Sequence, residues 1–227
     1  MSAVEQFVLD KIGKPGYFVD VGASDGFNDS NTLQLEQAGW NGICIDALER
    51  NYTQLVRKRK CYCEHAVIAA QNGVAEFVSQ SIGGSNGFGG SGMTAFMPQD
   101  HLNFIKWHLG GRISKVQTVT LISILQKYFA PNHIQFLDID VEGAAYNVIQ
   151  NFPFNKYIFD YINIEAGGRV LLDIQSLLSK YNYVEIERYG EMDSLFELQI
   201  PIPLTKWQKL WKFLMCYIKM LNRTYPN

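Results

Sequence analysis

The sequence has few cysteines, and their spacing does not predict a disulfide framework or a zinc site. Four cysteines occur among 227 residues. Cys61 and Cys63 stand two positions apart, but no second pair of this kind completes a zinc-binding pattern. We therefore expect reduced, structural thiols in a cytoplasmic protein.

Long hydrophobic runs are also absent. No stretch of about 18 uncharged apolar residues occurs, so the sequence predicts no membrane-spanning helix. Residues 1–11 contain acids and no long apolar run, so we expect no signal peptide. Both absences favour a cytoplasmic location, and only the C-terminal residues leave peripheral contact with a membrane open.

The chain has almost no excess of charge of either sign. Its formal net charge is −2, which does not favour a nucleic-acid partner. The average hides an asymmetry, because residues 205–227 contain five basic residues and no acid. The rest of the chain holds 15 of the 20 Lys and Arg residues against all 22 acids, so a basic segment follows an acidic body.

Hydrophobic residues make up 47% of the chain, enough for the core of one domain. Short β-rich runs alternate with helical patterns, which predicts an α/β fold with a mostly parallel sheet. The predicted strands are 17–21, 42–46, 62–67, 75–80, 134–140 and 161–165, and the predicted helices are 4–12, 32–38, 50–57, 121–129, 144–151 and 171–180. Residues 183–188 and 194–200 flank a turn-like segment and predict a closing antiparallel hairpin.

Residues 81–93 are rich in glycine and serine, and Phe88 lies at their centre. Because glycine loses the most backbone freedom on ordering, this run predicts neither a helix nor the interior of a strand. Two hypotheses remain. The segment is a flexible surface loop, or it is a lid that orders over a substrate with Phe88 at its tip.

The first predicted strand ends in a glycine turn that indicates a nucleotide-type ligand. Gly22 and Gly26 let the chain turn sharply and approach a ligand at the carboxyl end of the strand. The acids Asp20 and Asp25 would repel a pyrophosphate but suit the cationic sulfonium and ammonium groups of S-adenosylmethionine. Asp46 ends the second strand about 20 residues later, where it would accept hydrogen bonds from ribose hydroxyls. The alternative is a tight turn with Asp46 only capping a helix.

Two blocks of the sequence resemble the FkbM-type methyltransferases. Residues 18–52 are similar to the family's opening block, and residues 119–128 and 134–150 are similar to its second block. The resemblance implies a Rossmann-like class I methyltransferase fold over residues 1–204 with S-adenosylmethionine as cofactor. It places Asp20, Gly22 and Asp46 around the cofactor and suggests Ser30, Asn31 and Thr32 for its methionine end. The full predicted set of cofactor-binding residues is Asp20, Gly22, Ala23, Ser24, Asn31, Thr32, Asp46 and Asp138.

The sequence departs from the family pattern at two positions. Ser123 stands where the family usually has an acid, and Asp138 stands where it usually has a lysine. A carboxylate in place of the lysine changes the balance of charge at this strand end.

The densest group of acids follows the fifth predicted strand. Asp138, Asp140 and Glu142 point to the same side if the strand continues, and Glu165 ends the next strand along the chain. An all-oxygen set of Asp140, Glu142 and Glu165 predicts Mg²⁺ or Mn²⁺ as one hypothesis. Under the other hypothesis these acids bind substrate hydroxyls or cap the following helix.

The predicted catalytic residues are Asp140 and Glu165. Either carboxylate is the preferred general base if no metal is bound. His101 and His108 are outside candidates, because seven-residue spacing on a helix more often reflects packing.

Residues 205–227 predict a basic amphipathic helix. Apolar residues follow steps of three and four, with lysines on the other side. Such a helix packs on the domain, forms a homodimer contact, or lies on an anionic membrane surface through residues 205–223.

Together these features predict an S-adenosylmethionine-dependent O-methyltransferase. The resemblance suggests a hydroxyl of a sugar, glycan or other polyhydroxylated small molecule as the acceptor. The alternatives are a nucleotide-binding oxidoreductase and a non-catalytic α/β binding module.

Overall fold

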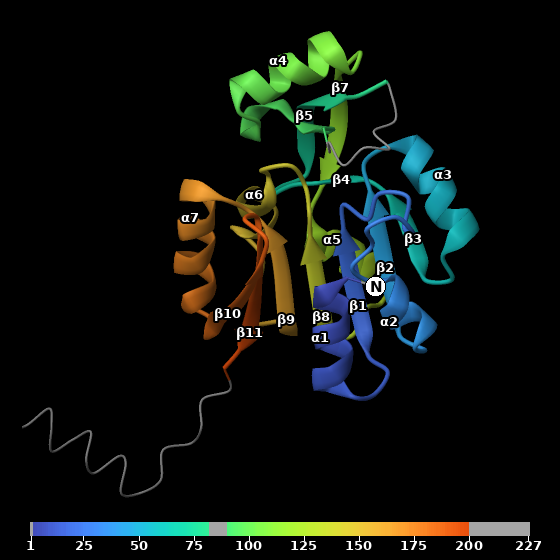
Figure 1. Ribbon diagram of the computed structural model, residues 1–227, viewed down its shortest axis with the longest axis vertical. Helices are drawn as coiled ribbons and strands as arrows, with labels where there is room; N and C mark the ends of the chain where they lie inside the picture. Colours follow the sequence, from blue (N-terminus) through green and yellow to red (C-terminus); the bar gives the residue numbers. More distant parts are fainter. Residues whose placement is uncertain (1, 82–89, 200–227) are drawn as a thin grey trace, which may run out of the picture.

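The computed structural model describes residues 2–81 and 90–199 (Figure 1). Its main element is a seven-stranded sheet in the order β10-β11-β9-β8-β1-β2-β3. The strands are β1 (Tyr17–Val21), β2 (Asn41–Asp46), β3 (Tyr62–His65), β8 (His133–Ile139), β9 (Ile158–Glu165), β10 (Tyr183–Tyr189) and β11 (Asp193–Leu198). This confirms the predicted α/β fold with a Rossmann-like sheet.

The sheet is parallel from β3 to β9, and the closing hairpin is antiparallel. Strand β1 pairs in parallel with β2 on one side and β8 on the other. Strands β8 and β9 also pair in parallel, so Asp138 aligns with Asn163. The hairpin β10–β11 joins the sheet through antiparallel pairing of β11 with β9. A parallel sheet finished by such a hairpin is the layout that the sequence predicted.

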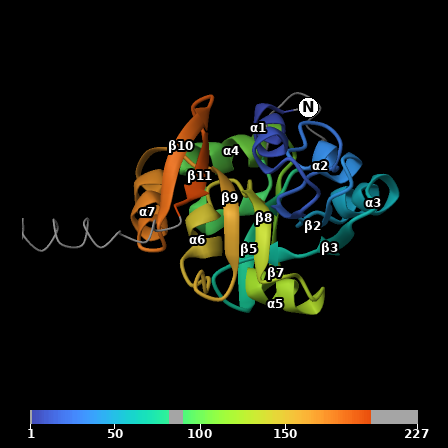
Figure 2. The same cartoon turned by 90° about the horizontal axis from the view of Figure 1, so that it is seen from below.

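Helices cover both faces of the sheet (Figure 2). On one face α1 (Ala3–Ile12), α2 (Leu33–Gln37) and α3 (Glu49–Lys58) pack over Phe18, Cys44 and Phe136. On the other face α5 (Leu121–Lys127), α6 (Ala145–Ile149) and α7 (Gly168–Ser179) pack over Val19, Ile43 and Leu137. Alternate residues of one strand thus enter different cores, as the period of two in a strand requires.

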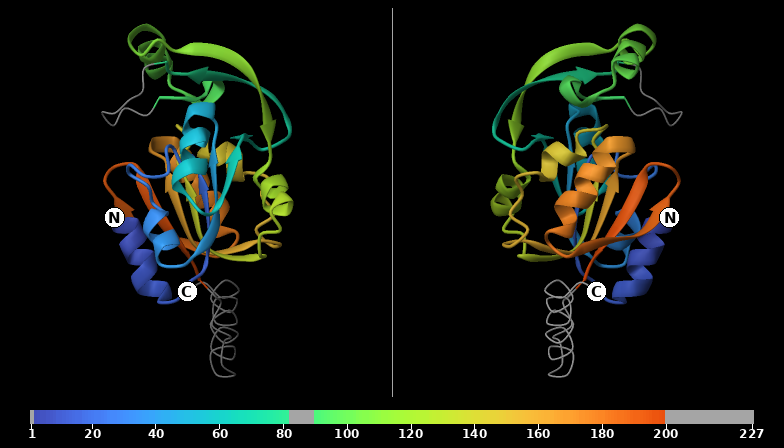
Figure 3. Two further views of the ribbon diagram at one scale, coloured as in Figure 1. Left: turned by 90° about the vertical axis from the view of Figure 1, so that its right-hand side faces the viewer. Right: turned by 90° about the vertical axis from the view of Figure 1, so that its left-hand side faces the viewer.

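A second, smaller sheet lies beyond the carboxyl ends of the large sheet's parallel strands (Figures 1 and 3). Its order is β4-β7-β5-β6, with β4 (Val67–Ile68), β5 (Gly73–Ser79), β6 (Gly92–Met93) and β7 (Arg112–Val119). A 3-10 turn (Thr94–Phe96) and α4 (Gln99–His108) complete this part.

The second sheet corrects two sequence-based expectations. The predicted strand 62–67 is broken at Ala66, because the chain leaves β3 of the large sheet and enters β4 of the small one. The glycine-rich segment 81–93 is not irregular throughout, since Gly92 and Met93 pair with Val78 and Phe77. The predicted Phe88 lid lies within residues 82–89, outside the described residues.

Two further expectations fall on the C-terminal residues. Residues 200–227 lie outside the described part of the chain, and so do the boundary after residue 204 and the predicted basic helix. Within residues 2–81 and 90–199, no helix is long and apolar enough to span a bilayer.

Candidate active site

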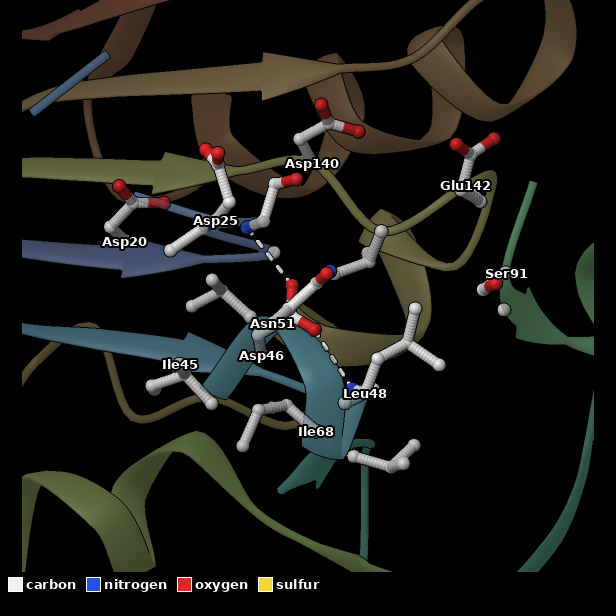
Figure 4. Close-up of a pocket in the computed structure, with 18 of the residues that line it drawn as sticks. Asp20, Asp25, Ile45, Asp46, Leu48, Asn51, Ile68, Ser91, Asp140 and Glu142 are labelled. Atoms are coloured by element: carbon white, nitrogen blue, oxygen red, sulfur yellow. Dashed lines mark hydrogen bonds between the residues drawn. The ribbon is translucent and has the colours of Figure 1, made fainter. Parts of the chain in front are cut away.

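A cleft of about 720 Å³ lies between the carboxyl ends of the parallel strands and the second sheet (Figure 4). Its floor comes from the ends of β1, β2 and β8, and its outer wall includes Phe77, Ser91 and Met93. Ligands of open α/β sheets bind at this edge. The location fits the sequence prediction for the donor site.

The glycine turn after β1 is held between its two neighbouring strands. Gly22 has a φ of +97°, which side-chain-bearing residues rarely adopt. Its N–H donates to the carbonyl of Ile45 at 2.9 Å. A Cβ atom at Gly22 would lie 1.7 Å from the carbonyl oxygen of Asp140. Backbone conformation and the close approach of β8 therefore both require glycine here.

Asp46 lies at the centre of the cleft floor and already binds the backbone on both sides. One carboxylate oxygen accepts from the N–H of Ser24 at 2.9 Å, and the other accepts from that of Leu48 at 2.8 Å (Figure 4). Burial raises the pKa of Asp46 to about 6. Ile45, Leu48 and Ile68 line the cleft around it and provide an apolar slot beside an acceptor.

Asp20 lies deeper than the sequence suggested and is 3% exposed. Its carboxylate accepts a 2.6 Å hydrogen bond from the hydroxyl of Thr32. Burial raises the pKa of Asp20 to about 6, although Thr32 and the nearby Arg59 guanidinium lower it. Asp20 still lines the cleft, but Thr32 is completely buried and is not among the lining residues. Thr32 thus supports Asp20 from below, and a direct contact between Thr32 and the cofactor does not fit this position.

Arg59 fixes the loop between β1 and α2, and sequence analysis missed it. Its guanidinium donates to the carbonyl oxygens of Gly26 at 3.2 Å and Thr32 at 3.1 Å. It also donates to the hydroxyl of Ser30 at 3.3 Å and forms an ion pair with Glu36 at 3.0 Å. Nothing near Arg59 in the sequence indicates that its side chain reaches back across more than 25 residues.

Asp138 also belongs to a buried polar layer beneath the cleft. Its carboxylate accepts hydrogen bonds from the amide of Asn31 at 3.1 Å and from that of Asn163 at 2.8 Å. Burial and the nearby Asp20 raise the pKa of Asp138 well above its ordinary value. Asp138 therefore orients Asn31, which lines the cleft together with Ala23 and Ser24.

Asp140 and Glu165 come together as the sequence predicted. Burial, followed by the hydrogen bond to the Glu165 carboxyl, raises the pKa of Asp140 well above its ordinary value. Asp140 lines the cleft, whereas Glu165 stands behind it. The two carboxyl groups form a pair in which only one has access to a substrate.

Glu142 does not follow Asp140 along one strand face. Strand β8 ends at Ile139, and Glu142 has a left-handed φ of +53°. The condition under which residues 138, 140 and 142 would share a strand face is therefore not met. Burial raises the pKa of Glu142 to about 7. Among the described residues no group of three His, Cys, Asp or Glu side chains is arranged to hold a metal, so the predicted set of Asp140, Glu142 and Glu165 lacks structural support.

The remaining lining residues give the cleft its charge. Arg50 is the single Lys or Arg among the described lining residues. His101 and His108 lie on α4 and do not line the cleft. Seven carboxylate side chains do line it: Asp20, Asp25, Asp29, Asp46, Asp138, Asp140 and Glu142. The cleft is thus strongly acidic.

Comparisons with solved structures find methyltransferases at low sequence identity. One is a methyltransferase FkbM from Methylobacillus flagellatus KT, with 12% identity and a TM-score of 0.46; the match covers 81% of this chain and 43% of that one. The second is Sp1610 from Streptococcus pneumoniae, provisionally assigned as a tRNA (m1A22) methyltransferase, with 9% identity, a TM-score of 0.43 and coverage of 100% and 90%. The third is yhhF from Escherichia coli, provisionally assigned as a methyltransferase, with 12% identity, a TM-score of 0.40 and coverage of 88% and 87%.

Sequence comparison identifies the family. No curated protein matches the chain. This chain spans less than half the length of the Methylobacillus protein. Residues 20–194 match the methyltransferase FkbM domain, a range that includes both the glycine turn and the acidic strand ends. The chain belongs to the FkbM methyltransferase family.

Proposed function

We propose that this chain is an S-adenosylmethionine-dependent O-methyltransferase whose acceptor is a hydroxyl of a neutral sugar, glycan or other polyhydroxylated small molecule. The observation that supports this best is the acidic cleft at the carboxyl ends of β1, β2 and β8. A cationic methyl donor is attracted by these carboxylates, whereas a dinucleotide pyrophosphate is repelled.

The donor half of the proposed site contains the groups that an adenosyl ligand needs. Asp46 accepts hydrogen bonds from the ribose hydroxyls, as its place at the end of β2 favours. Ile45, Leu48 and Ile68 offer apolar contact to the adenine ring. We assign Gly22 and Asn31, which also line the cleft, to the methionine end of the donor. The bound donor supplies the electrophilic methyl group.

The acceptor half centres on Asp140. Asp140 and Glu165 share one proton and keep one negative charge between them, and this pair takes the proton of the attacking hydroxyl through the accessible oxygen of Asp140. A hydroxyl oxygen then bonds to the methyl carbon as the carbon–sulfur bond breaks. Because no three-carboxylate metal set forms among the described residues, no step is assigned to Mg²⁺ or Mn²⁺.

The charge of the cleft also favours a class of acceptor. One of the similar structures is provisionally assigned to tRNA, but a polyanion would meet seven carboxylates and one arginine at this cleft. Neutral polyols are instead good hydrogen-bond donors to carboxylates. The acceptor is therefore a neutral hydroxyl compound and not a nucleic acid.

Isothermal titration separates the proposed function from its alternatives. We expect S-adenosylhomocysteine to bind and NAD to give no heat. Binding of NAD alone would indicate an oxidoreductase, and binding of neither would indicate a module that does not use a nucleotide.

Asp140→Asn tests the general base. We expect kcat to fall by about 10²–10⁴-fold with neutral polyol acceptors, because the amide cannot take the proton. Affinity for S-adenosylhomocysteine should change little. Asp160→Asn on β9 is the matched control, since Asp160 pairs with His133 and does not line the cleft. Unchanged kcat in Asp140→Asn would exclude Asp140 as the base.

A further inference from the structure

Three free thiols lie together at the start of β3, outside the cleft. Cys44 on β2 is fully buried, and Cys61 and Cys63 are partly exposed. The sulfur atoms of Cys44 and Cys61 are 3.5 Å apart. Cys63 lies beside them, because its thiol donates to the carbonyl oxygen of Cys61 and its backbone pairs with Cys44.

The surroundings of Cys61 favour its thiolate. The hydrogen bond with Cys44, together with the positive charge of Arg59, lowers the pKa of Cys61 below its ordinary value. The thiolate is the form that reacts with oxidants. Cys44 is the opposite case, because burial raises its pKa and keeps it as a thiol.

The thiol cluster is linked to the predicted donor loop through one carboxylate and one guanidinium. The backbone N–H groups of Lys60 and Cys61 donate to one oxygen of Glu36. The other oxygen of Glu36 pairs with Arg59. Arg59 in turn donates to the backbone and the hydroxyl of Thr32, whose hydroxyl bonds Asp20 at the floor of the cleft. A shift at Cys61 therefore acts on the groups that hold the donor loop.

We propose that Cys61 is a redox modification site that reacts with hydroperoxides and then forms a disulfide with Cys44, loosening the donor loop. In the first step the Cys61 thiolate attacks one peroxide oxygen and the O–O bond breaks. The sulfur becomes a sulfenic acid, and the other oxygen leaves as hydroxide or alkoxide.

The second step uses the neighbouring thiol. The Cys44 sulfur attacks the Cys61 sulfur, the S–O bond breaks, and the proton of Cys44 leaves with the hydroxyl group as water. The sulfurs must approach from 3.5 Å to a bond length of about 2.05 Å. That movement pulls Cys61 toward β2, and the reaction removes the thiolate charge of Cys61 from the surroundings of Arg59.

The effect on the methyl donor rests on the proposed function. Arg59 keeps its contacts to Thr32 only while Glu36 and residues 60–61 stay in place. We expect the disulfide to lower affinity for S-adenosylhomocysteine about tenfold, the equivalent of one hydrogen bond of this network.

Peroxide treatment followed by thiol counting and peptide mapping tests the site. Cys216 lies outside the described residues and is replaced by serine in every protein used. We expect two of the three remaining thiols to disappear, a cross-link between the peptides of Cys44 and Cys61, and weaker S-adenosylhomocysteine binding. Dithiothreitol should reverse all three changes.

Three variants separate the roles of the thiols. After peroxide treatment, Cys61→Ser should retain its remaining free thiols and its affinity for S-adenosylhomocysteine. Cys44→Ser should stop at a sulfenic acid that a dione probe traps. Cys63→Ala is the matched control and should still form the cross-link.

The proposal is overturned if all thiols survive peroxide, if the cross-link joins another pair, or if the cross-linked protein binds as tightly as the reduced one. If Cys61→Ser does not fold, peptide mapping of the oxidised wild-type protein and of oxidised Cys63→Ala still identifies which two cysteines are cross-linked. If the reduced protein binds no S-adenosylhomocysteine, the proposed function fails, while the thiol map still decides the modification.

Discussion

Gly22 shows how strictly a single position of the donor site is constrained. A Gly22→Ala substitution combines a positive φ with a Cβ placed 1.7 Å from the Asp140 carbonyl oxygen. We expect it to destabilise the fold by roughly 3 kcal/mol or more and to abolish S-adenosylhomocysteine binding. Chemical denaturation and titration calorimetry measure the two effects.

The control for Gly22 is a glycine with the same kind of backbone but open space. Gly190 has a φ of +68° and no atom within 4 Å of its Cβ position. Gly190→Ala should therefore cost only about 1–2 kcal/mol. If Gly22→Ala and Gly190→Ala lose the same free energy of unfolding, the close packing of Gly22 against the Asp140 carbonyl does not affect stability.

Asp46 predicts a pH dependence for donor binding. Burial raises its pKa to about 6, and only the carboxylate accepts from both ribose hydroxyls. Affinity for S-adenosylhomocysteine should thus fall as the pH drops through about 6 and stay level above it. Asp46→Asn should lose about 1–3 kcal/mol of binding at pH 8 and flatten the profile. A profile that keeps its shape in Asp46→Asn would assign the titration to another group, such as Asp20.

Among secondary-structure elements, α3 is joined to the loop before α2 by the buried side chain of Arg59. Replacing it in Arg59→Met leaves Glu36 without its cation and removes the guanidinium hydrogen bonds to the carbonyls of Gly26 and Thr32. We expect a loss of about 3–5 kcal/mol in the free energy of unfolding, as for other broken buried pairs. Urea denaturation measures it.

Lys58 gives a neighbouring control for Arg59. It pairs with Asp25 at 2.7 Å, but its side chain is 33% exposed. Lys58→Met should therefore change stability by less than about 1 kcal/mol. If the two variants lose the same stability, the burial of Arg59 has no energetic consequence.

The elements also differ in how well the sequence predicts them. Strands β1, β2, β8 and β9 are mostly apolar because both faces of the parallel sheet are covered, and all four were predicted. Strand β7 was missed, because its residues 112–119 are mostly exposed and contain Arg112, Lys115 and Gln117. Its strand conformation comes from pairing with β5, which no local pattern reveals.

The same division holds for the site residues. Gly22 and Asp46 were predictable because each follows the end of an apolar strand, where a short-range pattern marks it. Thr32 and Arg59 were not, because their roles depend on side chains meeting across the fold. The outer wall of the cleft with Phe77 and Met93 was missed together with the second sheet that supplies it.

Across the whole molecule, seven acids line the cleft at one edge of the sheet, and Asp20, Asp46 and Asp138 are buried there. Burial raises the pKa of Asp46 to about 6 and that of Glu142 to about 7, and it also raises the pKa of Asp138 and that of Asp140. Ionisation of these acids thus destabilises the ligand-free folded protein, although the same charges suit a cationic ligand.

Because of these raised pKa values, we expect the ligand-free protein to lose stability as the pH rises. A carboxyl group whose pKa is raised in the folded state holds a proton that the unfolded chain has already released, so the free energy of unfolding falls as the pH rises through the folded pKa. Asp46 and Glu142 together should account for about 3 kcal/mol between pH 5.5 and 8. Glu142→Gln should remove the part of the slope near pH 7 that this residue contributes, whereas Asp160→Asn outside the cleft should keep it. A free energy of unfolding that rises over this pH range in the wild type would contradict the burial of uncompensated acids. Bound S-adenosylmethionine should reduce the slope of the free energy of unfolding against pH, because it supplies the missing positive charge.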